Sequence, residues 1–300
     1  MKALITISVF AEFTGAEMYV YELARELKRT GHEPTIAVPR KNMGPAMGER
    51  AAAAGLKTIP LQDLRPEMEF DILHLNEKAP SEWALGIFPK TPAVATIHSE
   101  FACEEPLLSP RIFRYIAIRP GIKAKLEAAN GIDPSRIEVI PNGFDLARFN
   151  RHYDILREGP QDPDARPVVL FVGTIDRRRL EAIRKAAEYC QRTDREFWLV
   201  GLLARVRPEE LPRNAKVYPA TWDVEQYFNR CDETAGIMLG RTTIEGWLCG
   251  KPGWIYDVDE AGHVTNTTWT EPPQDLDRFN IRTVAGQIAS LYGQAREAAR

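Results

Sequence analysis

A glycine-rich turn separates two short apolar runs in GIMLGRTTIEGWLCGKPGWIY, residues 236–256. The pattern predicts a strand over 236–239, a helix over 242–249 and a second strand over 253–256. Strands that alternate with helices are typical of a parallel α/β sheet, whose helices begin near the carboxyl ends of the strands. The turn at Gly240 would therefore present helix N-terminal amides, which bind phosphate through unpaired N–H groups and the positive end of the helix dipole.

Glu245 lies one turn inside this helix. Its carboxylate could reach past a bound phosphate and accept hydrogen bonds from a ribose diol. A surface carboxylate that stabilises a helix start would have the same spacing, so the sequence leaves both interpretations open.

The composition narrows the class of protein. With 300 residues and 44% apolar content, the chain can bury one large core or two ordinary ones, and its length favours two domains. A net charge of -3, with both signs interspersed, disfavours non-specific binding to a nucleic-acid duplex or an anionic membrane. The apolar run at 1–10 is too short to span a membrane and has no cleavage site after it, so no integral membrane association is expected.

The cysteines show no paired spacing. They are Cys103, Cys190, Cys231 and Cys249. This scatter indicates neither a zinc site nor a disulfide framework. A cytoplasmic location fits this usage best.

Short apolar runs alternate with helical patterns along the chain, as in the βα units of a mostly parallel sheet. Strands of a first sheet are predicted at 2–9, 34–38, 57–60, 70–75, 92–97, 114–118 and 136–140. A polar, proline-rich run without periodicity follows. We expect it to be a linker, 151–166, between an N-terminal domain, 1–150, and a C-terminal domain, 167–300.

A second sheet is predicted in the C-terminal half. Its strands are expected at 168–172, 197–200, 217–218, 235–239 and 254–256. Helices are expected between them, for example over 178–191 and 224–231. The last segment, 281–299, has helical spacing of apolar residues and could pack across either domain.

Two candidate ligand positions follow strands of the first sheet. Gly15 lies at the start of the helix after the first strand, where the absence of a side chain permits close approach of a ligand, although a simple turn is the alternative. His98 follows the strand 92–97 at its carboxyl end, the edge where open α/β sheets bind ligands. Its imidazole could hydrogen-bond a sugar hydroxyl or stabilise charge near neutral pH, whereas a lone histidine is more often structural.

Three consecutive arginines, Arg177, Arg178 and Arg179, follow the turn after the strand 168–172. Guanidinium groups form bidentate, charge-assisted hydrogen bonds to phosphate. A solvated basic helix start is the alternative, but such charges are unfavourable beside the positive end of a helix dipole. The mismatch favours phosphate binding.

Four segments, in order, resemble the retaining glycosyltransferases of family 4. The matching segments are Gly15-Ala16-Glu17 with the helix behind it, 136–145 with its Ile140-Pro141-Asn142-Gly143 motif, 172–179 and 240–252. The resemblance implies an α/β protein with the GT-B fold, in which two Rossmann-like, doubly wound parallel-sheet domains face a cleft. It also implies transfer of a sugar from a nucleoside diphosphate sugar to a hydroxyl acceptor. A UDP-sugar is the expected donor, and neither a cofactor nor a metal ion is expected.

Site residues follow from the resemblance by position. The expected catalytic residues are His98, Arg179 and Arg241, with His98 contacting the transferred sugar and Arg179 in place of the family's clamp lysine. The expected donor-binding residues are Gly15, Gly173, Thr174, Arg177, Arg178, Gly240, Thr242, Thr243 and Glu245, with Gly15 near the diphosphate and Glu245 on the ribose. The sequence does not identify the acceptor, and a modified nucleic-acid base is one of several classes left open.

The chain departs from the family pattern at two positions. Thr174 stands where the family has a clamp arginine, so either Arg177 or Arg178 substitutes or part of the phosphate compensation is missing. Ile237 stands where the family has the first glutamate of a pair. Arg241 is the expected compensating cation. Because a fold does not fix the chemistry, a nucleotide-sugar epimerase or hydrolase of the same fold stays open. The departures at Thr174 and Ile237 leave a further alternative, a non-catalytic nucleotide-sugar-binding subunit.

Overall fold

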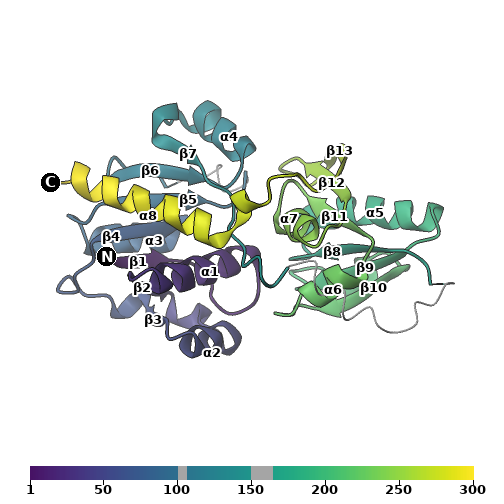
Figure 1. Ribbon diagram of the computed structural model, residues 1–300, viewed down its shortest axis with the longest axis horizontal. Helices are drawn as coiled ribbons and strands as arrows, with labels where there is room; N and C mark the ends of the chain where they lie inside the picture. Colours follow the sequence, from purple (N-terminus) through teal and green to yellow (C-terminus); the bar gives the residue numbers. More distant parts are fainter. Residues whose placement is uncertain (101–106, 150–164) are drawn as a thin grey trace. The chain divides into compact units, whose positions relative to one another are not determined.

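The computed structural model describes residues 1–100, 107–149 and 165–300. The chain divides into two compact units, of which unit 1 comprises Met1–Phe144 with Arg278–Arg300, and unit 2 comprises Asp145–Asp277. Each unit contains one sheet (Figure 1). The predicted linker, 151–166, lies outside the described residues except for its last two positions, and Cys103 lies outside them as well.

Unit 1 is built on seven parallel strands in the order β3-β2-β1-β4-β5-β6-β7. The strands are β1 Lys2–Thr6, β2 Glu33–Val38, β3 Lys57–Pro60, β4 Ile72–Asn76, β5 Ala93–Ile97, β6 Ile112–Ala117 and β7 Ile137–Val139. Every strand predicted for the first sheet is confirmed. The order reverses between β1 and β4, which makes this the topological switch point of a Rossmann-like sheet.

Helices cover both faces of this sheet. They are α1 Gly15–Arg29, α2 Pro45–Ala53, α3 Lys78–Ile87, α4 Pro120–Asn130 and α8 Ile281–Ala298. Right-handed crossovers put α1 and α2 on one face and α3 and α4 on the other. The last helix, α8, packs beside α1 and across β4, β5 and β6, where the connections between these strands leave the face uncovered (Figure 1).

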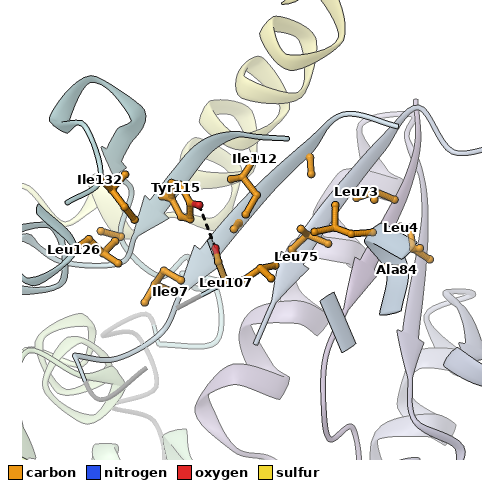
Figure 2. Packing of buried hydrophobic residues seen from close by; sticks show 14 of the residues in the cluster. Leu4, Leu73, Leu75, Ala84, Ile97, Leu107, Ile112, Tyr115, Leu126 and Ile132 are labelled. Atoms are coloured by element: carbon orange, nitrogen blue, oxygen red, sulfur yellow. Dashed lines mark hydrogen bonds between the residues drawn. The ribbon is translucent and has the colours of Figure 1, made fainter. Parts of the chain in front are cut away.

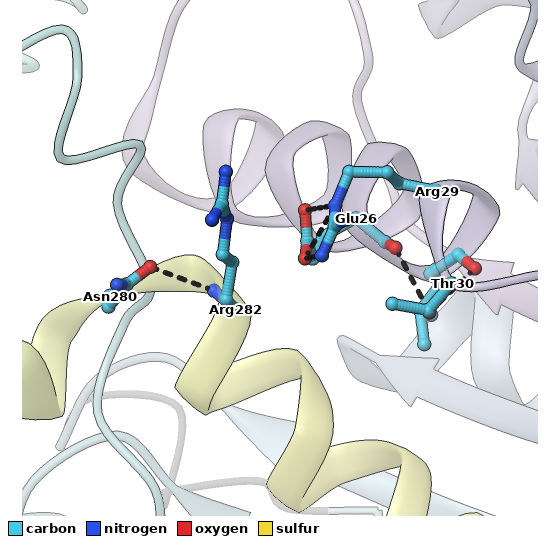
Figure 3. A network of polar contacts seen from close by, with 6 residues as sticks. Glu26, Arg29, Thr30, Asn280 and Arg282 are labelled. Atoms are coloured by element: carbon cyan, nitrogen blue, oxygen red, sulfur yellow. Dashed lines mark hydrogen bonds and ion pairs between the residues drawn. The ribbon is translucent and has the colours of Figure 1, made fainter.

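The start of α8 is capped by Asn280. Its side-chain oxygen accepts a hydrogen bond from the backbone N–H of Arg282 at 3.1 Å. Figure 3 shows this cap together with α1, on which Arg29 pairs with Glu26. The chain leaves unit 1 at the same place. Phe144 donates its N–H to the carbonyl of Phe279 at 2.8 Å and accepts from the N–H of Ile281 at 2.9 Å. Unit 2 is therefore inserted into unit 1 at two adjacent backbone positions.

The two faces of the central strands differ in polarity. Leu73 and Leu75 of β4 join Ala84 of α3 and Ile97 of β5 in an apolar core (Figure 2). Because successive side chains of a strand point to opposite faces, the polar residues between them turn towards α1 and α8. The candidate site of unit 1 lies on this second face.

Unit 2 has six strands in the order β10-β9-β8-β11-β12-β13. They are β8 Val168–Val172, β9 Glu196–Gly201, β10 Ala215–Pro219, β11 Glu233–Ile237, β12 Gly253–Val258 and β13 Val264–Thr270, with helices α5 Leu180–Arg192, α6 Glu225–Arg230 and α7 Arg241–Leu248. The five strands predicted for this sheet are confirmed. The edge strand β13, which pairs antiparallel with β12, was not predicted.

Glycines let α7 lie close to β11. A Cβ on Gly236 of β11 would be 2.1 Å from Oγ1 of Thr243, and a Cβ on Gly246 of α7 would be 2.6 Å from Cγ2 of Thr234. Any larger residue at either glycine would push the helix away from the strand. The spacing of these small residues therefore fixes the position of the helix start.

Among the described helices, none combines the length and the apolar character that crossing a membrane would require.

Candidate functional site

In unit 1, His98 follows β5 at its carboxyl end. Its Nε2 lies 2.8 Å from Oδ1 of Asn76, which ends the neighbouring strand β4. The amide nitrogen of Asn76 lies 3.5 Å from the carbonyl of His74, which identifies Oδ1 as the acceptor. His98 therefore donates from Nε2 and keeps the lone pair of Nδ1 available to accept a hydrogen bond.

The surroundings of His98 hold it neutral. Burial, reinforced by the nearby positive charge of Arg119, lowers its pKa to about 4. Arg119, the N-cap residue of α4, donates from Nε to the carboxylate of Glu100 at 2.7 Å. The ring of Tyr19 on α1 meets the imidazole edge-on, with centroids 4.8 Å apart. His98 is thus an uncharged acceptor near pH 7.

Glu17 shapes the loop between β1 and α1. The residue is 3% exposed, and its carboxylate accepts from the backbone N–H groups of Ala11 at 3.0 Å and Glu12 at 2.7 Å, and from the hydroxyl of Thr14 at 3.1 Å. Burial nevertheless raises its pKa to about 7. Gly15 is the exposed first residue of α1, directly after this loop, and no N-cap side chain bonds to the first-turn amides.

In unit 2, the order of strands reverses between β8 and β11, and α7 starts at the carboxyl end of β11. Gly240, its N-cap residue, has no side chain with which to cap the helix. Thr242 donates its hydroxyl hydrogen to the carbonyl of Val172, which ties the helix start to the end of β8. Met238, in the turn between β11 and α7, has a φ of 51°, a conformation that is strained for a side chain of this size and that occurs preferentially at functional sites.

Arg241 and Glu245 form an ion pair along α7. Nη2 and Nε of Arg241 lie 2.9 Å and 3.1 Å from Oε1 of Glu245. The two side chains are 12% and 5% exposed, so the pair is largely out of water. The sequence left open a surface position for Glu245, and its burial excludes that alternative.

The segment after β8 carries the predicted arginine cluster. Gly173 has a φ of 142°, which favours glycine, and its carbonyl would lie 1.7 Å from a Cβ placed on Gly201 of β9. The three arginines form the 3-10 helix Arg177–Arg179. Arg179 pairs with Asp176 and is about one-third exposed, whereas Arg177 is 75% exposed and lies 3.8 Å from Glu210.

No group of three or more histidine, cysteine, aspartate or glutamate side chains that could hold a metal ion occurs within the described residues.

Comparison with known proteins agrees with this architecture. Residues 13–148 match the family model described as Glycosyltransferase Family 4. Over this part, the chain is similar to glycosyltransferase family 4. No curated protein sequence matches the chain.

Solved structures show that the likeness of fold extends over both units. HepE of Anabaena, in complex with UDP-glucose, has a TM-score of 0.68 at 17% identity, over 100% of this chain and 98% of that one. Sucrose-phosphate synthase of Thermosynechococcus elongatus has a TM-score of 0.68 at 16% identity, over 99% and 100%. An α-glucosyltransferase in complex with UDP and a 13-mer DNA has a TM-score of 0.60 at 12% identity, over 100% and 94%. The chain therefore has the GT-B fold.

The predicted site residues of this chain fall into two groups. In unit 2, the hydrogen bond from Thr242 brings the start of α7 beside the end of β8, so the Gly240 turn and the Gly173 turn are neighbours. Thr243 packs against β11 with 1% exposure, and a donor contact from its side chain stays a prediction. In unit 1, His98 and Gly15 lie at the carboxyl edge of the sheet. That both groups serve one donor also stays a prediction.

The family motif at 140–143 has a structural role in unit 1. A Cβ on Gly143 would lie 2.6 Å from Cδ1 and 2.9 Å from Cα of Ile281, the first residue of α8. Glycine is therefore required for α8 to dock at the point where the chain leaves unit 1.

Sequence reasoning missed the partners of His98. Asn76 directly follows the predicted strand 70–75 and ends β4 next to the switch point, so its place at the carboxyl edge was a usable signal. Tyr19 is one helical turn from the predicted Gly15, but its contact with His98 depends on how α1 crosses the sheet. Glu100 and Arg119 follow different strands and gave no local signal.

Proposed function

We propose that this chain transfers a sugar from a nucleoside diphosphate sugar, with a UDP-sugar as donor, to a hydroxyl acceptor with retention of anomeric configuration. The observation that carries the proposal is the start of α7. Its uncapped turn at Gly240 lies at the switch point of the unit 2 sheet, and Arg241 follows directly. Helix amides and a guanidinium in this position suit a diphosphate. HepE, which shares the fold, is described in complex with UDP-glucose.

In this reaction, negative charge grows on the diphosphate as its bond to the sugar breaks. Arg179, Arg241 and the first amides of α7 would stabilise that charge without a divalent ion. The ion pair with Glu245 would hold Arg241 in place before the donor binds, since it restricts a long side chain. Glu245 also keeps its proposed contact with the donor ribose.

His98 would contact the transferred sugar. Its Nδ1 lone pair is free of the bond to Asn76 and can accept a hydrogen bond from a sugar hydroxyl. Because burial and Arg119 lower its pKa to about 4, the imidazole accepts this bond throughout the neutral range.

The test is to incubate the protein with a panel of UDP-, GDP- and ADP-sugars in the presence of EDTA. Thermal stabilisation by each compound reports binding, and release of nucleoside diphosphate with hydroxyl acceptors reports transfer. We expect stabilisation and release to be greatest with one UDP-sugar, and an α-linked product from an α-linked donor. Acceptors should include a lipid-linked sugar, an oligosaccharide and DNA with a hydroxymethylated base.

Other outcomes would replace the proposal with one of its alternatives. An isomeric sugar nucleotide formed without acceptor would identify an epimerase, and free sugar formed with water alone a hydrolase. Binding of donor without release of nucleoside diphosphate for any acceptor would favour a non-catalytic subunit, in keeping with Ile237 where the family has a glutamate.

A further inference from the structure

Four buried side chains of unit 1 form a continuous line of hydrogen bonds behind His98. The hydroxyl of Tyr292, on α8, lies 2.6 Å from Nδ1 of His74, and Nε2 of the same ring lies 2.7 Å from Oγ1 of Thr96. Oγ1 of Thr96 lies 3.0 Å from the hydroxyl of Tyr19, on α1. We name this line the Tyr19–Tyr292 chain, and its members are Tyr19, Thr96, His74 and Tyr292.

Because its members are buried, the hydrogen bonds of the Tyr19–Tyr292 chain depend on one another. Each of its members is at most 1% exposed. Burial lowers the pKa of His74 to about 3, so its neutral ring donates from one nitrogen and accepts at the other. The hydroxyl groups on either side must orient accordingly. Loss of any hydroxyl would leave a buried polar partner without this hydrogen bond, which is costly at such low exposure.

The Tyr19–Tyr292 chain ends against His98. The ring of Tyr19, whose hydroxyl bonds to Thr96, meets the imidazole of His98 at an interplanar angle of 74° and a centroid distance of 4.8 Å. Asn76 holds Nε2 of the same imidazole. One hydrogen bond and one ring contact therefore fix the plane of His98 and the direction of its Nδ1 lone pair.

We propose that Tyr292 is a positioning residue for His98 and acts through the Tyr19–Tyr292 chain. This role rests on the proposed function, in which His98 contacts the transferred sugar. Tyr292 itself touches none of the groups assigned to the donor. It belongs to the last helix of the chain, which packs beside α1 and supplies the terminal hydroxyl that keeps His74, and hence Tyr19, in a single orientation.

The alternative is that Tyr292 only fills the core. Its ring does pack edge-on against His74, with centroids 5.7 Å apart. A phenylalanine at this position would preserve that packing and remove only the hydroxyl. Tyr292→Phe therefore distinguishes a core-filling role from a positioning role.

The test uses the full-length, ligand-free protein labelled with 15N and 13C in its histidines. The NMR signals of the His98 ring are assigned by comparison with His98→Asn. These signals and the tautomer that they report are then recorded for Tyr292→Phe and for Thr96→Val, which interrupts the middle of the Tyr19–Tyr292 chain. Thr96→Ser keeps the hydroxyl and should restore the wild-type signals. Tyr115→Phe is the matched control, because Tyr115 is another buried tyrosine of unit 1, whose hydroxyl donates to the carbonyl of Leu107 instead.

We expect the His98 signals to shift in Tyr292→Phe and Thr96→Val and to stay in place in Tyr115→Phe. With the best donor, Tyr292→Phe should lower kcat by about tenfold while KM for the donor changes by less than about twofold. The reason is that His98 loses its alignment with the transferred sugar, whereas the groups that bind the donor are unchanged. Unchanged His98 signals in folded Tyr292→Phe would overturn the proposal, as would an equal shift in Tyr115→Phe. If the wild type transfers no sugar, the proposed function fails, and the spectra still decide whether the coupling exists.

Discussion

Glu17 makes the stability of unit 1 depend on pH in a way that a surface carboxylate would not. Burial raises its pKa from the ordinary value of 4.5 to about 7, so the folded state holds the proton more tightly than the unfolded chain. The resulting stabilisation is complete below pH 4.5 and is lost as the pH rises through about 7. We expect a loss of about 3 kcal/mol across this window relative to Glu17→Gln. Hydrogen exchange of core amides of β1, measured for both proteins at several pH values, checks it.

The comparison with Glu17→Gln isolates this residue, since all other titrating groups are shared. Parallel pH profiles for the two proteins would contradict the assignment.

Arg179 tests the proposed compensation of diphosphate charge. Removing one such donor from a transition state typically slows turnover by about a hundred- to a thousandfold, and we expect this loss in Arg179→Ala. Steady-state kinetics with the best donor measures it. Arg213→Ala is the matched control, because it removes an exposed arginine of the same unit that lies outside the proposed site. Equal rates for the two variants would remove Arg179 from the site.

The pair of Arg241 and Glu245 predicts strong coupling within α7. Breaking a largely buried pair from one side leaves the other charge without this partner, so Arg241→Ala should lower the unfolding free energy of unit 2 by about 3 kcal/mol. In the double variant with Glu245→Gln, the loss should be smaller than the sum of the single losses by about 1–3 kcal/mol. Urea unfolding followed by tryptophan fluorescence measures it, since every tryptophan except Trp83 belongs to unit 2. Additive losses would show that the two residues act independently.

These residues also show where sequence reasoning about the site reached its limit. Glu245 and Arg241 were assigned separate ligand contacts, and the helical spacing of four that joins them was present in the sequence. The contact of His98 with Tyr19, by contrast, links residues far apart in the chain. No local pattern encodes such a contact.

At the level of elements, Gly236 is one of the two glycines that let α7 lie close to β11. An alanine at 236 would place Cβ 2.1 Å from Oγ1 of Thr243, so Gly236→Ala should destabilise unit 2 by about 1–3 kcal/mol. Oγ1 of Thr243 has no hydrogen-bond partner in the described part of the chain, and without it the nearest atom would be 3.4 Å away. Adding Thr243→Ala should therefore restore most of the stability, measured as the urea midpoint of unit 2.

A glycine with open space around it provides the control. A Cβ on Gly286 of α8 would meet nothing within 4 Å, so Gly286→Ala should raise stability by about 0.5–1 kcal/mol through helix propensity alone. A double variant no more stable than Gly236→Ala would mean that the helix position does not depend on this contact.

The sheets were more predictable than their edges. Buried parallel strands such as β8 are continuous apolar runs, and each predicted strand is present. The exception is β13, whose sequence VTNTTWT is mostly polar and exposed along its length. Its pairing with β12 comes from a free sheet edge, which a search for apolar runs does not detect.

For the whole molecule, the insertion of unit 2 at Phe144 predicts which parts can fold alone. Residues 1–149 lack α8, whose buried Val284, Ile288 and Leu291 complete the core beside α1, so this fragment should not fold. Joining residue 146 to residue 277 through a short glycine linker should restore folding, because Phe144 is hydrogen-bonded to both Phe279 and Ile281. Amide spectra of the two fragments measure this difference.

Ile288→Ala in the joined fragment is the control for the helix itself. Removing this fully buried side chain should cost about 2–5 kcal/mol. A well-dispersed spectrum for residues 1–149 alone would show that α8 is dispensable.

The same insertion reverses the order in which the protein matures on the ribosome. Residues 1–144 emerge first, yet their core waits for Arg278–Arg300, which are synthesised after the whole of unit 2. Unit 2 is complete as soon as residue 277 has left the exit tunnel. The later-encoded unit should thus be the first to reach its native state, while the earlier one exposes apolar surface and depends on chaperones until Arg278–Arg300 have emerged.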